Sequence, residues 1–349
     1  MVNWQIASFS VSTSAAGETS DALYANGRMQ VLVNIQIKAI VPDSDSSSTP
    51  YTLSKHELDS IRLMDYFTHA ELANHGNGWV WSTKKSPFAG SLYSTGMAEF
   101  QAEADSQLVQ LWVSSTISEK KSIGASIRQP DNTVVRTSDS SYNSYIVLKA
   151  EPAIDYTYPE NVGFEQEKAG SGHYEIDFVG ISDPSRRWDQ VNYYLTTKNH
   201  HLLYSETNSY EVYKHDNPYS DEHLECCYAG QVRADVDGSL SLFFLWKNPL
   251  GTKASKPRVG LKSVVNGLFP SGPWTAEAFA DITVNDKKNS VCLSYLNFRD
   301  TPMQVINRLW PVTWGTVAKI TVYDVHGNKG TFKASHTDEN DGVVIHNDN

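Results

Sequence analysis

The residues best suited to chemistry in this sequence gather between positions 200 and 227. Imidazole, thiolate and carboxylate groups together are the usual ligands of zinc and copper. Their spacing does not fit a metal site, since the segment contains no C-x2-C pair and no H-x3-H pair. We therefore predict no metal site and no cofactor, and expect loop or core roles for these residues. The group comprises His200, His201, His215, His223, Glu225, Cys226 and Cys227.

A second candidate is the segment Asp235-x-Asp237-Gly238, which begins like a calcium-binding loop. A complete loop of that kind needs further oxygen ligands and ends on a Glu. Here the chain continues into Leu242-Phe243-Phe244, which is typical of a strand. The sequence therefore predicts a hairpin turn at Asp237-Gly238.

Motifs for covalent catalysis or nucleotide binding are missing from the sequence. It contains no G-x-S-x-G nucleophile motif and no phosphate-binding G-x-x-x-x-G-K-[ST] loop. Asp189 beside Trp188 and Glu225 beside Cys226 could act as acid or base, but the separation of two carboxylates is a property of the fold. We favour a protein that is not an enzyme and keep the enzymatic alternative open.

Tryptophans in turn-rich segments are the candidate ligand-binding residues. One pair shares a face of an extended segment after a Gly-rich turn, a second pair surrounds a Pro, and a fifth follows two Pro residues. Indole rings stack on sugars and also settle at membrane interfaces. The alternative is that the rings close the ends of a hydrophobic core. The five residues are Trp79, Trp81, Trp310, Trp314 and Trp274.

The charge of the chain bears on its partners. The formal net charge is −11, whereas nucleic-acid affinity depends on clustered Lys and Arg. The dense basic pairs are isolated: Lys120-Lys121, Arg186-Arg187 and Lys287-Lys288. We therefore expect no nucleic-acid partner.

The amino-terminal residues bear on localisation. Residues 1–20 have neither a basic region nor an unbroken apolar run, so we expect no signal peptide. No stretch approaches the roughly 18 apolar residues of a membrane helix. The expectation is synthesis in the cytoplasm, with release by a non-classical route left open. Three cysteines also fit a reducing compartment.

The pattern of apolar residues indicates strands almost throughout. From Met29 to Ile40, apolar and polar residues alternate, which predicts a strand with one buried face. The turn signal Asn26-Gly27 suggests that this strand neighbours Ile6–Val11. Ser54 stands three residues before Glu57, the spacing of a capping box, and predicts one helical turn. A short helix is also expected over Thr301–Leu309.

These elements predict an all-β chain of two or three antiparallel β-sandwich domains, Ig-like or related, with few short helices. The first domain is expected at residues 1–152 and the second at 153–262, with the boundary at Glu151-Pro152. Residues 263–349 form either a third β domain or the continuation of the second.

The function favoured at this point is non-enzymatic recognition of a surface or a carbohydrate, with a glycan or cell-surface component as partner. The first alternative is a membrane-acting, β-pore-forming toxin or effector. It is motivated by the amphipathic, Ser/Thr-rich strand pair from Val109 to Ser126. The second alternative is a structural subunit of an appendage or assembly.

We predict that Cys226, Cys227 and Cys292 are free thiols. Adjacent cysteines can bond only through a strained ring, and their odd number leaves no complete set of pairs. Intact mass before and after alkylation under denaturing conditions should show three modified thiols. A native mass lower by one pair of hydrogen atoms would contradict the prediction.

Overall fold

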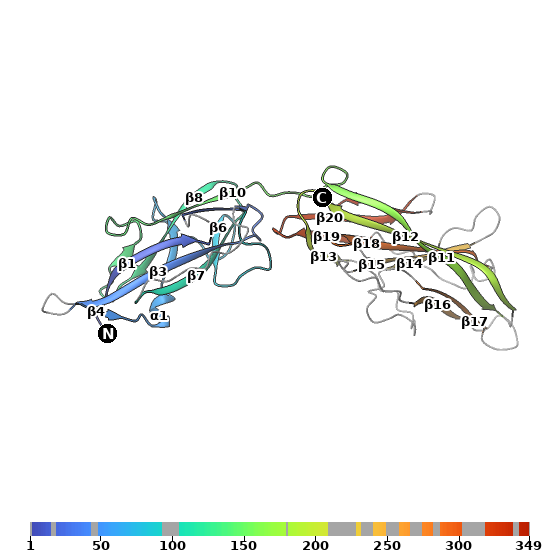
Figure 1. Ribbon diagram of the computed structural model, residues 1–349, viewed down its shortest axis with the longest axis horizontal. Coiled ribbons are helices and arrows are strands. Elements are labelled where there is room, and N and C mark those ends of the chain that lie inside the picture. Colours follow the sequence, from blue (N-terminus) through green and yellow to red (C-terminus); the bar gives the residue numbers. More distant parts are fainter. Residues whose placement is uncertain are drawn as a thin grey trace. The chain divides into compact units, whose positions relative to one another are not determined.

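The computed structural model describes twelve stretches of the backbone (Figure 1). They are residues 2–14, 19–42, 48–92, 105–178, 181–208, 228–231, 240–248, 258–265, 274–281, 287–301, 318–337 and 342–348. The protein is built of strands in several antiparallel sheets, which confirms the predicted all-β sandwich fold. No helix in these stretches is long and apolar enough to cross a membrane.

The predicted helical turn is present as α1 (Lys55–Leu58). Ser54 is its N-cap, and both hydrogen bonds of the capping box form. Glu57 also accepts a hydrogen bond of 2.6 Å from the indole Nε1 of the buried Trp4. The second predicted helix lies outside the described residues beyond Thr301, which ends a strand.

The chain divides into two compact units. Unit 1 contains residues 1–154 and 325–328, and unit 2 contains residues 155–324 and 329–349. Strands from both predicted later domains share one sheet of unit 2, where β12 (Ile181–Thr197) pairs with β18 (Val291–Thr301).

Two five-stranded sheets make up the part of unit 1 that the structure describes. The first has the order β1-β3-β7-β6, with β4 paired to β3. Its strands are β1 (Gln5–Thr13), β3 (Val31–Pro42), β4 (Ser48–Tyr51), β6 (Trp79–Ser82) and β7 (Gln107–Ser115). The second has the order β2-β10-β8-β5, with β9 paired to β8. Its strands are β2 (Ser20–Tyr24), β5 (Arg62–Asp65), β8 (Lys120–Arg128), β9 (Val134–Arg136) and β10 (Ile146–Glu151).

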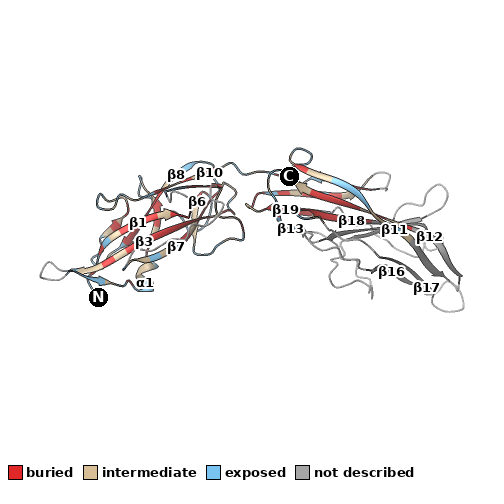
Figure 2. Ribbon diagram, in the orientation of Figure 1, coloured by how far each residue is buried: buried red, intermediate tan, exposed pale blue. Residues whose placement is uncertain are grey.

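One hydrophobic core joins the two sheets of unit 1 (Figure 2). Val33 and Ile35 of β3 are fully buried in the same cluster as Leu63, Ile123 and Leu148 from the second sheet. β1 pairs antiparallel with β3, so the predicted neighbours are confirmed. The intervening β2 belongs to the other sheet, so the two strands do not form a simple hairpin.

The prediction that the strands between Val109 and Ser126 pair with each other is wrong. β7 bonds to β3 and β6 in the first sheet, whereas β8 bonds to β10, β5 and β9 in the second. Alternate apolar residues of both strands lie in the shared core, namely Leu111 and Val113 of β7 and Ile123, Ala125 and Ile127 of β8. Core burial accounts for their amphipathic pattern, which removes the motivation for a pore-forming hairpin.

Residues 325–328 complete unit 1 although they follow β19 in the sequence. The side-chain amide of Asn26 donates to the His326 carbonyl at 3.0 Å, and Arg28 Nε donates to the Gly327 carbonyl at 2.6 Å. Gly327 has a φ of +82°, a conformation that favours glycine.

The described residues of unit 2 form three sheets. The largest has the order β11-β12-β18-β15-β14, a second has the order β13-β19-β20-β21, and β16 pairs with β17. The remaining strands are β11 (Val162–Phe178), β13 (Leu202–Asn208), β14 (Tyr228–Gln231), β15 (Leu240–Asn248), β16 (Arg258–Val265), β17 (Trp274–Asp281), β19 (Ala318–Asp324), β20 (Lys329–His336) and β21 (Val343–Asn347). β14 and β15 pair antiparallel, while Asp237-Gly238 lies outside the described residues.

Candidate functional site

The structure places the first predicted tryptophan pair in and beside the core of unit 1. Trp79 is 6% exposed, and its Nε1 donates to Glu119 Oε1 at 2.8 Å. Trp81 is half-buried against the same core and donates to the Leu72 carbonyl at 3.0 Å. A ring as buried as that of Trp79 has little surface left to stack on a ligand. This position agrees with the alternative that the indole closes the end of a hydrophobic core.

The other predicted tryptophans lie where their side chains are not described. Trp274 begins β17, and only its backbone is described. Trp310 and Trp314 lie outside the described residues. Their proposed contact with a ligand stays a prediction.

The segment with metal-binding residue types is described only at His200 and His201. Both lie in the turn after β12, where the His200 carbonyl accepts a hydrogen bond from Thr197. Within the described ranges, no three His, Cys, Asp or Glu side chains are grouped to hold an ion. Cys292 is a buried free cysteine, whereas Cys226 and Cys227 fall outside those ranges.

A cluster of exposed rings in unit 1 is a stronger candidate for binding. We call it the aromatic patch, formed by Tyr66, Phe67 and Tyr145. The ring centroid of Tyr66 lies 4.5 Å from that of Tyr145 and 5.2 Å from that of Phe67. The centroids of Phe67 and Tyr145 are 6.4 Å apart. Phe67 is 72% exposed and Tyr145 is 40% exposed. Large apolar groups that cluster while facing water are typical of interaction sites.

The second sheet brings these rings together. Ile123 of β8 pairs with Asp65 at the end of β5 on one side and with Ile146 at the start of β10 on the other. Tyr66 and Tyr145 therefore lie beside the same part of β8. Gly124 leaves room for Thr137 and the Tyr66 ring, because a Cβ atom there would lie 2.6 Å from Thr137 Oγ1 and 3.4 Å from Tyr66 Cδ2.

Asp65 fixes the turn that presents Phe67. Its Oδ1 accepts hydrogen bonds from the backbone N–H groups of Phe67 at 3.0 Å and Thr68 at 2.9 Å. Its Oδ2 lies 3.0 Å from Lys121 Nζ. The hydrogen bond from Thr68, together with those from Lys121 and Phe67, lowers the pKa of Asp65 to about 2. The turn is thus held by a charged acceptor.

The loop before Tyr145 is anchored to the edge of β1. Tyr142 donates to the Ile6 carbonyl at 2.8 Å, and Ser144 Oγ accepts from the Val11 N–H at 3.0 Å. Asn143, between these anchors, accepts a hydrogen bond of 2.7 Å from the Tyr66 hydroxyl. The loop therefore fixes both a ring and a polar side chain of the patch.

A serine and a histidine lie close together in the same loops. His69 Nε2 is 3.2 Å from Ser138 Oγ; His69 is exposed and Ser138 is half-buried. Nucleophilic catalysis also needs a group that orients the imidazole and donors for the developing oxyanion. No described carboxylate contacts this imidazole. The pair is suited to hydrogen bonding with a ligand.

Sequence reasoning missed the aromatic patch because Tyr66 and Tyr145 lie far apart in the sequence. A period-two pattern does not show that β5 and β10 both pair with β8. The available signal was turn chemistry, since Asp65 precedes Phe67 and Thr68 as in an Asx turn.

Comparisons with known proteins found only low structural similarity. No protein-family model matches the chain, and no curated protein matches it. Several solved structures align with low similarity, among them the following two. Invasin, a bacterial integrin-binding protein, has a TM-score of 0.19 and 8% identity, over 93% of this chain and 59% of invasin. The C-terminal domain of the Streptococcus pyogenes antigen I/II-family protein AspA has a TM-score of 0.20 and 10% identity, over 93% of this chain and 98% of that domain. TM-scores this low carry no argument about function.

We expect the free energy of unfolding of Asp65→Asn to depend less on pH in the acid range than that of the wild type. The folded-state pKa lies below the ordinary 3.8, so the carboxylate stabilises the fold above pH 3.8 and this contribution is lost as pH falls toward about 2. With allowance for solvent screening, the contribution is on the order of 1–2 kcal/mol. Urea unfolding across this pH range measures it.

Asp59→Asn is the matched control, because Asp59 forms an exposed pair with Lys55 on α1. It should leave the pH dependence close to that of the wild type. Equal pH profiles for Asp65→Asn and the wild type would contradict the assigned role of Asp65.

We expect Trp79→Ala to destabilise unit 1 by roughly 3–5 kcal/mol, because it opens a cavity in the core and leaves Glu119 without the indole donor. Phe67→Ala should cost little, because the ring is largely in water. Denaturant unfolding of the two variants compares them. A Trp79→Ala variant as stable as Phe67→Ala would show that the indole is not a core residue.

Proposed function

We propose that the protein recognises a carbohydrate of a cell surface through the aromatic patch, without catalysing a reaction. The observation that carries this proposal is the mutual contact of Tyr66, Phe67 and Tyr145, with two of the rings substantially exposed. A ligand that covers these rings removes apolar surface from water.

The chemistry of the rings suits a sugar. An aromatic face carries partial negative charge and attracts the polarised C–H groups on the apolar face of a pyranose ring. Sugar hydroxyl groups also need hydrogen-bonding partners. Asn143 contacts the Tyr66 hydroxyl, and His69 and Ser138 supply further polar groups on the two loops that carry the rings. Apolar ring faces bordered by amide, imidazole and hydroxyl groups suit a ligand that has both an apolar face and hydroxyl groups.

The rigidity of the patch supports recognition by a preformed surface. The Asp65 turn holds Phe67, and the anchors at Tyr142 and Ser144 hold the loop that leads into Tyr145. Groups that are already ordered lose little conformational entropy when a ligand binds. More of the favourable energy of the contacts with the ligand then contributes to affinity.

A glycan array probed with the full chain tests the proposal. We expect binding to a limited set of glycans, and Phe67→Ala and Tyr145→Ala should each weaken it by about tenfold or more. Melting temperatures should stay near that of the wild type because neither change opens a core cavity. Tyr66→Phe should have a smaller effect, because it keeps the ring and removes only the hydroxyl donor to Asn143.

Ile117→Ala is the matched control, since Ile117 is a 49% exposed apolar residue of unit 1 outside the patch. It should leave glycan binding unchanged. The proposal fails if no glycan binds, or if Phe67→Ala and Ile117→Ala bind every glycan alike.

A further inference from the structure

The three rings of the aromatic patch occupy a small area. The most widely separated pair, Phe67 and Tyr145, has its ring centroids 6.4 Å apart. The Tyr66 centroid lies 4.5 Å from that of Tyr145 and 5.2 Å from that of Phe67, so every ring neighbours both others. A six-membered sugar ring with its substituents has a similar width. The patch is therefore about the size of one pyranose.

The exposed apolar area of the patch is small for a protein interface. An aromatic side chain buries about 150–250 Å² when it is fully covered. Phe67 is 72% exposed and Tyr145 is 40% exposed, so covering both rings buries about 170–280 Å². A standard protein–protein interface buries about 800 Å² on each partner. The area favours a small ligand over a second copy of this chain or another protein.

The rings of the patch do not form a flat platform. The Phe67 ring is inclined by 89° to that of Tyr66 and by 53° to that of Tyr145. An extended polysaccharide chain that lies flat against one of these rings therefore meets the next ring at an angle. A single sugar can place its apolar face on one ring and the C–H groups of its edge against another.

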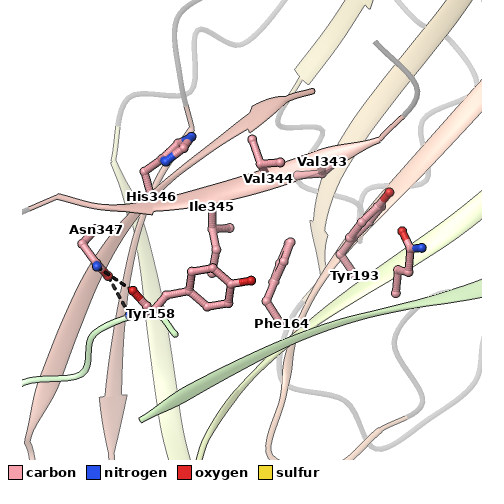
Figure 3. A pocket seen from close by; sticks show the side chains of 9 residues that line it. Tyr158, Phe164, Tyr193, Val343, Val344, Ile345, His346 and Asn347 are labelled. Carbon is pink, nitrogen blue, oxygen red and sulfur yellow. Dashed lines mark hydrogen bonds between the residues drawn. The ribbon is translucent and has the colours of Figure 1, made fainter. Parts of the chain in front are cut away.

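A groove in unit 2 shows a contrasting arrangement of rings (Figure 3). Its volume is about 500 Å³, and Phe164 lies between Tyr158 and Tyr193. The successive ring centroids are 6.4 Å and 5.4 Å apart. These rings follow one another along the groove, whereas the three rings of the patch surround one point. The patch is the more compact of the two aromatic surfaces.

Two side chains of the patch can bind the hydroxyl groups of a sugar. Asn143 accepts the Tyr66 hydroxyl through Oδ1, which leaves its side-chain N–H groups to donate. Within the described ranges, neither these N–H groups nor the Tyr145 hydroxyl has a hydrogen-bond partner. Asn143 and Tyr145 are both exposed. A residue at the non-reducing end of a glycan carries more free hydroxyl groups than an internal residue, so these polar groups suit a chain end.

We infer that the aromatic patch binds a single terminal pyranose of a glycan. The inference rests on the proposed recognition of a carbohydrate and specifies which part of the glycan the protein contacts. Phe67 and Tyr145 supply two inclined ring faces, and Asn143 together with the Tyr145 hydroxyl binds the sugar hydroxyl groups. The affinity is then set by one sugar and does not grow with the length of the chain attached to it.

The test begins with saturation-transfer NMR of the full chain and a panel of methyl glycosides. The panel contains glucose, galactose, mannose, fucose, N-acetylglucosamine and N-acetylgalactosamine. The sugar that receives the strongest transfer is then placed in two tetrasaccharides of equal composition, at the non-reducing end in one and at an internal position in the other. Calorimetry measures the affinity of the methyl glycoside and of both tetrasaccharides.

We expect the methyl glycoside and the tetrasaccharide with the terminal residue to agree in affinity within about threefold, and the internal isomer to bind about tenfold more weakly or worse. Tyr145→Phe and Asn143→Asp should each weaken binding about three- to tenfold, because each removes hydrogen-bonding capacity and keeps the neighbouring contacts. Leu108→Ala, at a 37% exposed apolar residue of β7, is the matched control and should bind like the wild type.

The possible contrary results separate this inference from the proposed function. An affinity that rises about tenfold from the methyl glycoside to the tetrasaccharide with the terminal residue would overturn the inference alone. Equal binding of the two tetrasaccharides, or array binding without transfer to any methyl glycoside, would do the same. Binding to no saccharide at all would overturn both. A dimer of the free chain that Phe67→Ala dissociates, measured by light scattering, would also overturn both, because a second copy would then occupy the patch.

Discussion

Val31, Val33, Ile35 and Ile37 of β3 are fully buried in one cluster with residues from the opposite sheet. This packing excludes water between the two sheets of unit 1 and is the contact on which the rest of the unit depends. Removing apolar surface from water is the main favourable contribution to folding. It fixes the face that each strand turns inward, and thereby the residues that remain on the outer surface.

The aromatic patch is a consequence of this arrangement. Ile123 faces the core, and the next residue, Gly124, leaves room on β8 for the ring of Tyr66. Phe67 has no such support and remains in water, held by the hydrogen bonds of Asp65. Well-defined backbone interactions thus maintain an exposed ring, which is the opposite of what burial alone would favour.

Unit 2 presents a different kind of surface. Its groove is lined by the rings of Tyr158, Phe164 and Tyr193 and by residues of β21, whereas the rings of the aromatic patch lie in unit 1.

Local signals in the sequence determined the all-β class, the strand at β3 and the single turn of α1. Alternation identifies a buried face, and the spacing of Ser54 and Glu57 identifies a helix start, because both depend only on residues close in sequence. Only the tertiary structure decided that β7 and β8 belong to different sheets and that Trp79 is a core residue. It also brought the rings of Tyr66 and Tyr145 into contact. Period-two alternation is the same for every choice of partner strand, so pairing depends on contacts between distant segments. Exposure likewise depends on what those segments cover.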